Sequence, residues 1–142
     1  MYSTLPGAMI VSENIGVSIN NFLENYMAQR LVAVLMHSRD QAHLFHLMTK
    51  SYAEHKALQK YYEKITELLD DYAEAYMGKY GRFRAFSINS RLNKDPRKAQ
   101  LFFRKLFTRV RSIRTPPDSE LRNILDEIKA LIRRTQYMLT LR

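Results

Sequence analysis

Apolar residues recur at every third or fourth position along most of this chain, a spacing that places their side chains on one face of an α-helix. Two long stretches show the pattern most clearly. The first contains Phe22, Tyr26, Leu31, Val34, Leu35, Ala42 and Phe45, and the second contains Leu58, Tyr62, Ile65, Leu69, Tyr72 and Tyr76. The sequence has neither the alternation of a half-buried strand nor a hairpin signal. The chain is therefore predicted to be all-α.

Capping and helix-breaking residues divide this helical sequence into four segments. The boundaries are a capping-box signature at Ser51–Glu54 after a break at residues 49–50, an Asp95–Pro96 pair, and a turn at Thr115–Asp118. The predicted helices cover about residues 18–48, 52–79, 96–114 and 119–142. Two long helices joined by a tight turn and followed by two shorter ones predict a four-helix bundle. We expect one domain of residues 1–142, with residues 1–17 as an N-terminal tail.

The composition excludes several classes of protein. The 142 residues include no cysteine, which excludes disulfides, thiolate metal sites and cysteine nucleophiles. The longest apolar run, residues 31–36, is far shorter than the roughly 20 residues that cross a bilayer, so we expect no membrane association. The N-terminus lacks the basic region of a secretory signal. We therefore expect a cytoplasmic protein.

The net charge of +9 is concentrated in one segment. Residues 82–117 hold eleven basic residues and one acidic residue, which gives +10, whereas residues 1–81 hold seven basic and nine acidic residues, which gives −2. Such a segment either contacts phosphate groups or neutralises the acidic first half. The residues expected to contact nucleic acid, weakly and without reading its sequence, are Arg97, Lys98, Arg104, Lys105 and Arg109.

All four histidines lie in the first half of the chain, near the first predicted turn. His43 precedes the turn at residues 49–50 by about six residues and His55 follows it by about five, so both are expected at nearly the same height on antiparallel helices. Imidazoles placed in this way can share a metal ion. The alternative is that they are solvated residues near helix ends. His37 and His46 are expected to support such a site or to lie at the surface.

A cluster of carboxylates lies on one face of the second predicted helix. Its members are Glu67, Asp70, Asp71 and Glu74, at spacings of i, i+3, i+4 and i+7. Like charges at these spacings repel one another, so this face favours a cation. That cation is either a metal ion or a basic side chain of the third helix.

The distance along the second helix limits how the two clusters can act together. His55 and Asp70 are 15 residues apart, or about 22 Å of helical rise, so they cannot bind one ion within one chain. Two chains with antiparallel second helices would bring His43 and His55 of one to Asp70 and Glu74 of the other, twice per dimer. The spacing therefore predicts a homo-oligomer that contains a two-fold dimer, with a metal site between its subunits.

The pattern of His43, His55, Asp70 and Glu74 resembles that of the Dps-like mini-ferritins, the DNA-protecting proteins of starved bacteria. The flanking residues agree with this resemblance, since Gln41 and Ala42 precede the first histidine and an Asp-Tyr-Ala segment separates the two carboxylates. The match covers about residues 41–81. The resemblance implies a ferritin-like four-helix bundle and assembly of the dimers into a cage.

The resemblance also implies an activity, which is oxidation of Fe(II) by hydrogen peroxide or oxygen, together with iron storage. Iron (Fe2+/Fe3+) is the implied cofactor. His43, His55 and Asp70 would be terminal ligands, and Glu74 a bridging ligand. Two positions depart from the family pattern: Leu44 replaces a tryptophan, and Gln59 replaces a further carboxylate. Because hard cations prefer carboxylate oxygen, we expect a weaker hold on a second iron.

Two other functions are compatible with the sequence. One is a structural or assembly protein that keeps the bundle and has lost the metal chemistry, as the departures from the family pattern would allow. The other is a nucleic-acid-binding bundle without redox chemistry, in which aromatic residues of the basic segment stack on bases. The helical spacing of Phe102, Leu106, Val110 and Ile113 instead assigns these apolar side chains to the core.

Overall fold

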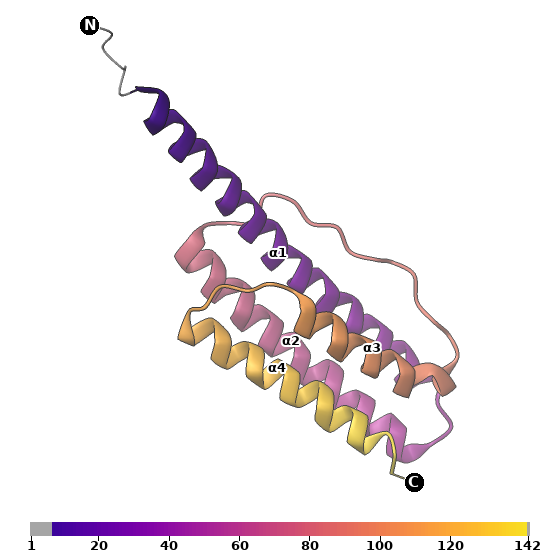
Figure 1. The fold of residues 1–142 in the computed structure, drawn as a ribbon. Coiled ribbons are helices and arrows are strands. Elements are labelled where there is room, and N and C mark those ends of the chain that lie inside the picture. Colours follow the sequence, from indigo (N-terminus) through magenta and orange to yellow (C-terminus); the bar gives the residue numbers. More distant parts are fainter. Residues whose placement is uncertain (1–6, 142) are drawn as a thin grey trace, which may run out of the picture.

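Four α-helices form the computed structural model, which describes residues 7–141 (Figure 1). They are α1 (Gly7–Met48), α2 (Tyr52–Tyr80), α3 (Ala99–Ser112) and α4 (Ser119–Met138), with the short 3₁₀ helix η1 (Pro96–Lys98) directly before α3. No strand occurs among the described residues. The prediction of an all-α four-helix bundle is confirmed.

The helices form two antiparallel hairpins joined by one long connection. A tight turn joins α1 to α2, and a short loop joins α3 to α4. The connection between the hairpins, residues 81–95, runs along α1 from one end of the bundle to the other (Figure 1). Helix α2 contacts α1 and α4, while α3 contacts α4 and α1. The fold is therefore a four-helix bundle with a single long crossover.

Local sequence signals explain where the helices begin and end. The Ser51 hydroxyl accepts a hydrogen bond from the Glu54 backbone N–H at 3.3 Å, which caps α2. The Glu54 carboxylate accepts a hydrogen bond from the Thr49 hydroxyl at 2.6 Å. Side-chain hydrogen bonds of both Ser51 and Glu54 therefore stabilise the turn before α2. Helix α2 ends at Gly81, whose φ of 93° favours glycine. The Asp95 carboxylate caps η1 by accepting the Arg97 N–H at 3.0 Å.

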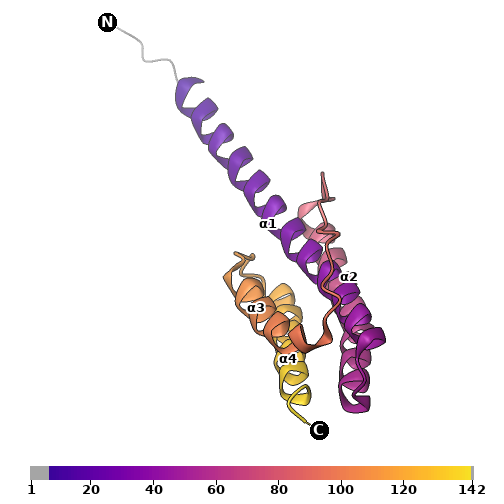
Figure 2. The same cartoon turned by 90° about the vertical axis from the view of Figure 1, so that its right-hand side faces the viewer.

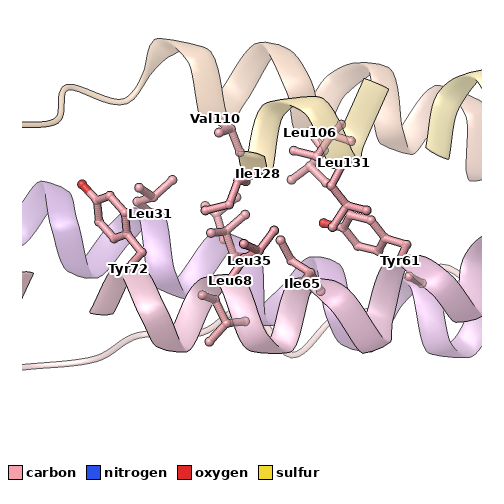
Figure 3. Close-up of a cluster of buried hydrophobic side chains, with 14 of the residues drawn as sticks. Leu31, Leu35, Tyr61, Ile65, Leu68, Tyr72, Leu106, Val110, Ile128 and Leu131 are labelled. Carbon is pink, nitrogen blue, oxygen red and sulfur yellow. The ribbon is translucent and has the colours of Figure 1, made fainter. Parts of the chain in front are cut away.

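All four helices contribute to one apolar core. Figure 3 shows Leu35 of α1, Ile65 of α2, Val110 of α3 and Ile128 of α4 directed toward one another. All four side chains are fully buried. Burying each aliphatic side chain of this size contributes roughly 1.5–3 kcal/mol to folding. The core extends along the whole length shared by the four helices.

Tyrosine hydroxyls in this core differ in their hydrogen bonding. The Tyr61 hydroxyl lies 2.6 Å from the Ser38 hydroxyl, which itself donates to the Leu35 carbonyl at 2.7 Å. Burial raises the pKa of Tyr61 well above its usual range, against a smaller opposite effect of the Ser38 hydrogen bond. The buried Tyr72 hydroxyl has no hydrogen-bond partner among the described residues.

The predicted core is right over most of its length and wrong at four positions, which are Phe22, Tyr26, Tyr62 and the half-buried Phe102. Tyr62 is half-buried, and Tyr61 takes the place in the core that was predicted for it. Phe22 and Tyr26, predicted to be buried, are 58% and 52% exposed. Both lie on the part of α1 beside the last turns of α2, where the adjacent Asn25 donates to the Arg82 carbonyl at 3.4 Å, but their side chains stay largely exposed there.

The first helix is longer than predicted. It begins at Gly7, so residues 7–17, predicted as an N-terminal tail, continue α1. Its 42 residues correspond to about 63 Å, against about 43 Å for the 29 residues of α2. The N-terminal part of α1 therefore projects beyond the rest of the bundle (Figure 2). None of the helices in the described part of the chain is long and apolar enough to cross a membrane.

Candidate metal site

The turn between α1 and α2 brings two histidine rings into contact. The His46 and His55 rings are stacked, with centroids 3.7 Å apart and planes inclined by 23°. Nδ1 of His46 lies 2.8 Å from the His55 carbonyl oxygen, and Nδ1 of His55 lies 3.0 Å from the His46 carbonyl oxygen. His46 is 8% exposed and His55 is half-buried. The pair therefore joins the last turn of α1 to the first turn of α2.

These contacts fix which nitrogen of each imidazole carries a hydrogen. A carbonyl oxygen only accepts, so Nδ1 of both rings must donate. In the neutral tautomer this leaves Nε2 of each ring with a free lone pair. Histidines that bind metals usually donate their other ring N–H to a carbonyl or carboxylate in this way. The orientation of His55 is thus the one that a metal ligand requires.

His43 lies elsewhere than predicted. It was expected to face His55 across the turn, but His46 occupies that position. The His43 ring is exposed and stacks on Tyr62 of α2 at a centroid distance of 4.3 Å, and it lies 5.9 Å from the His46 ring. The three imidazoles and Tyr62 therefore form one cluster on the outer side of the α1–α2 hairpin.

The carboxylates predicted as ligands lie on the solvent side of α2. Asp70 and Glu74 are exposed, and within the described residues neither has a hydrogen-bond or ion-pair partner. Glu67 pairs with Lys64 at 2.8 Å. The alternative that this acidic face pairs with the third helix is wrong, because no ion pair in the described part of the chain joins its carboxylates to α3, which meets α2 through the Tyr61–Phe103 ring contact in the core.

One chain does not bring the predicted ligands together. At 100° per residue, Asp70 lies about 60° and Glu74 about 100° around α2 from His55, and about 22 Å or more along it. Across residues 7–141, no three His, Asp or Glu side chains are grouped so as to hold a metal ion. A site made of His43, His55, Asp70 and Glu74 thus requires a second chain, and it stays a prediction.

The two departures from the family pattern occupy different surroundings. Leu44 is half-buried on α1. The Gln59 amide, one turn after His55, donates to the Glu63 carboxylate at 2.9 Å. Glu63 is exposed, so a carboxylate lies one turn beyond the position where the family pattern has one.

The basic residues of α3 lie on its outer face. The apolar residues of the same helix face the core, as their spacing predicts. Phe103, Leu106, Val110 and Ile113 are buried, and Phe102 and Phe107 are half-buried. The predicted nucleic-acid contacts Lys98, Arg104, Lys105 and Arg109 are all exposed, and none has an ion-pair partner in the region from residue 18 to residue 141. Arg97 is different, because its guanidinium binds Asp95 and holds the pKa of that carboxyl below its usual value.

Sequence reasoning missed the side chains that fix the crossover. His37, expected to support a metal site or lie at the surface, donates Nε2–H to the Arg91 carbonyl at 2.8 Å. Gln41, noticed only as part of the family pattern, is 2% exposed and binds the backbone of Asn93. A buried glutamine on an otherwise apolar helix face was the available signal, because buried amides need hydrogen-bond partners.

Comparisons with known proteins give a family and one relative. A family model described as "Family of unknown function (DUF5856)" matches residues 46–139, and the chain belongs to this family. The chain is similar to the "Uncharacterized 14.6 kDa protein in mobD-ri intergenic region" of Enterobacteria phage T4. The two are 27% identical over 114 residues, which cover 80% of this chain and 88% of that protein. No solved structure matches the chain.

Proposed function

We propose that this protein is a Dps-like ferroxidase and iron-storage protein that oxidises Fe(II) at a site shared between two subunits. One observation carries the proposal: Asp70 and Glu74 are exposed and lack partners among the described residues, while His55 on the same helix keeps its Nε2 free. Unpaired like charges one turn apart are unfavourable on a helix unless a cation is nearby. The single long crossover, which is the connectivity of ferritin-like bundles, also supports the proposal.

The shared site needs a two-fold dimer in which the α2 helices of the two copies lie antiparallel. The separation of about 22 Å along α2 then places His55 of each copy near Asp70 and Glu74 of the other. The outer side of the α1–α2 hairpin is free for this contact, because α4 and α3 cover the opposite side of α1 and α2. Each dimer would hold two equivalent sites, and such dimers are the units from which a cage would be built.

The ligand types suit ferrous iron. Imidazole nitrogen and carboxylate oxygen both bind Fe(II), and the absence of cysteine removes the soft ligands that would favour other metals. His43 and His55 would be terminal ligands, Asp70 a terminal carboxylate, and Glu74 a bridge between two metal positions. The His46 carbonyl holds the His55 ring in the orientation that directs Nε2 outward. Fe(II) would enter as the substrate and lose one electron to hydrogen peroxide or oxygen.

Complementation between two inactive variants tests the shared site. His55→Ala and Asp70→Ala should each abolish rapid Fe(II) oxidation, because each removes a ligand from every site. When the two variants are co-expressed, half of the dimers are mixed, and one of the two sites in each mixed dimer carries neither substitution. Oxidation should therefore return to roughly a quarter of the wild-type value per dimer. Asp71→Ala is the control, since Asp71 is exposed, adjacent in sequence, and outside the predicted ligand set.

Three results would count against the proposal. Full activity in either single variant would mean that the four residues are not the site. Loss of activity that the mixture does not restore would mean that the site is not shared. Wild-type protein that oxidises Fe(II) no faster than buffer would favour the structural or assembly function instead.

A second candidate function is weak, non-specific binding of nucleic acid by the basic face of α3. The observation in its favour is that Lys98, Arg104, Lys105 and Arg109 are exposed and have no ion-pair partner in the described part of the chain. Basic side chains that are exposed and not engaged in ion pairs can contact phosphates without reading bases. This binding is compatible with a metal site, because none of these basic residues is a predicted metal ligand.

A further inference from the structure

A small cavity lies where α1, the crossover and α3 meet, away from the candidate metal site. Its volume is about 50 Å³. The polar side chains around it are Arg30 and His37 of α1, Ser87 and Asn89 of the crossover, and Arg109 of α3, and two aliphatic residues of α1 complete the lining. Three segments that are distant in sequence thus direct hydrogen-bond donors to one place, and the lining contains no acidic residue.

Most of these donor groups have no hydrogen-bond acceptor among the described residues. The Asn89 side chain accepts the Arg91 backbone N–H through Oδ1 at 3.0 Å, which leaves its amide N–H groups available. For the Arg30 and Arg109 guanidiniums and the Ser87 hydroxyl, the described residues provide neither a hydrogen-bond acceptor nor an ion-pair partner. The cavity therefore offers guanidinium, amide and hydroxyl donors and a net positive charge to whatever occupies it.

Two guanidinium groups beside one cavity repel each other unless an anion lies between them. Arginine has a planar fork of N–H donors that matches the oxygen atoms of phosphate and carboxylate groups. A tetrahedral oxyanion presents several acceptor oxygens, which suits donors arriving from three directions. The cavity volume of about 50 Å³ exceeds the roughly 10–15 Å³ of such volume that one water molecule needs, so a ligand larger than water can enter.

The walls of the cavity are held in place. The His37 ring donates Nε2–H to the carbonyl of Arg91, two residues after Asn89 in the crossover, at 2.8 Å. Gln41 binds the backbone of Asn93 two residues later. These contacts fix the extended crossover against α1, so Ser87 and Asn89 are positioned before a ligand arrives. Such preorganisation lowers the entropic cost of binding.

We propose that this cavity binds a phosphate group, with Arg30 and Arg109 neutralising its charge and Ser87 and Asn89 donating to its oxygen atoms. The group is either free inorganic phosphate or a phosphodiester of nucleic acid lying on the basic face of α3. This proposal does not depend on the metal chemistry, because no residue of the cavity is a predicted metal ligand.

Binding of inorganic phosphate to the purified protein tests the proposal. Phosphate should raise the midpoint of thermal unfolding above that in chloride at equal ionic strength, because a ligand that binds only the folded state stabilises it. Calorimetric titration should show that Arg109→Gln weakens phosphate binding more than tenfold, since it removes a charge-assisted contact. Ser87→Ala, in an exposed segment where folding is not at risk, should weaken it about two- to tenfold.

Arg111→Gln is the matched control. It removes an equal charge from the same helix two residues away, at an exposed position outside the cavity lining, and should leave phosphate affinity within about twofold of wild type. Equal losses in the Arg109 and Arg111 variants would mean that phosphate responds only to net charge, which would overturn the proposal. Equal midpoints in phosphate and chloride for the wild-type protein would overturn it as well.

Competition with a short DNA duplex distinguishes the two phosphate sources. If the cavity holds a phosphodiester, inorganic phosphate at constant ionic strength should displace DNA from the wild-type protein and not from Arg109→Gln. If it holds free phosphate, the wild-type protein should bind phosphate without any change in its DNA affinity. In both cases the proposal requires that Arg109→Gln lose phosphate binding.

Discussion

Gln41 binds the backbone of Asn93 through both polar atoms of its side chain. Its Nε2 donates to the Asn93 carbonyl oxygen at 2.8 Å, and its Oε1 accepts the Asn93 N–H at 2.7 Å. The two residues are 52 positions apart, and Gln41 is 2% exposed. This amide fixes the crossover at the point where it turns into η1, and so sets the path by which the second hairpin returns to the first.

Gln41→Leu should release the end of the crossover. The variant loses two hydrogen bonds between a buried amide and the backbone, so we expect a loss of about 1–2 kcal/mol in the free energy of unfolding. Arg91 and Lys94 flank the released residue, and trypsin should cut after them faster than in the wild-type protein. Gln59→Leu is the control, because its amide bonds only to an exposed carboxylate and the change should stay within about 0.5 kcal/mol. Unchanged cleavage at both sites would show that the crossover is held by other contacts.

His46→Ala should destabilise the protein much more than His43→Ala. His46 is 8% exposed, stacks on His55 and donates to its carbonyl oxygen, so we expect a loss of about 1–3 kcal/mol. His43 is exposed, and among the described residues its ring contacts are with Tyr62 and His46, so its removal should cost less than about 1 kcal/mol. Urea unfolding monitored by circular dichroism measures both values. Equal values would show that the reciprocal hydrogen bonds contribute little to stability.

The positions of these two histidines show what spacing can and cannot predict. Periodicity and caps predict the hairpin and its turn, because both depend on local preferences. His43 and His46 are three residues apart, so they lie one above the other on nearly the same face of α1. Counting residues from the turn cannot choose which of them meets His55, since the choice depends on how closely the helices approach. With the turn and the Ser51 cap as predicted, His46 is the residue that lies opposite His55.

Two further differences between the predicted and the observed structure also arise from tertiary contacts. The apolar spacing of Phe22 and Tyr26 identifies one helix face, but not whether neighbouring segments cover it. Both residues lie beside the last turns of α2, and their side chains stay more than half exposed. The crossover has no periodicity, so the contacts of His37 and Gln41 with it could not be read from the sequence. The cavity near Arg109 depends on those contacts.

Tyr61→Phe and Tyr72→Phe should have different effects on stability. The Tyr61 hydroxyl bonds to the Ser38 hydroxyl at 2.6 Å, so its removal should cost about 0.5–1.5 kcal/mol. The buried Tyr72 hydroxyl has no partner in the described part of the chain, so its removal should be neutral or stabilising. Both substitutions leave the aromatic ring in the core, and each therefore serves as the control for the other. A larger loss in Tyr72→Phe would mean that its hydroxyl is hydrogen-bonded in solution.

Asp118 links the start of α4 to the end of α2 and should make stability depend on pH. Its carboxylate accepts hydrogen bonds from the Lys79 ammonium and the Tyr80 hydroxyl, and these contacts lower its pKa below the usual value. The contribution is therefore fully present above the ordinary carboxyl pKa of about 4 and is lost as the pH falls through the lower folded-state pKa. Asp118→Asn should be less stable than the wild type at pH 7, and the difference should shrink below pH 4.

Urea unfolding of both proteins between pH 7 and pH 3 checks this dependence. Asp126→Asn is the control, because its carboxylate is exposed and 3.8 Å from Lys129, a separation at which surface ion pairs contribute little. Its stability relative to wild type should change little over the same range. A difference for Asp118→Asn that stayed constant from pH 7 to pH 3 would show that the carboxylate charge is not what stabilises this contact.

DNA binding by the basic face of α3 should be weak, independent of sequence and sensitive to salt. Each neutralised phosphate releases condensed counterions, which contributes about −0.9 to the slope of log K against log salt concentration. Arg104 and Lys105 are adjacent and exposed, so replacing both with glutamine should make that slope less negative by up to about 1.8. Two duplexes of unrelated sequence should lose affinity equally, because contacts to phosphate do not read bases.

Arg122→Gln on α4 is the control. Arg122 is also exposed but lies outside the basic segment, so removing its charge should leave the slope nearly unchanged. Affinity that does not vary between low and physiological salt would exclude the electrostatic mechanism altogether.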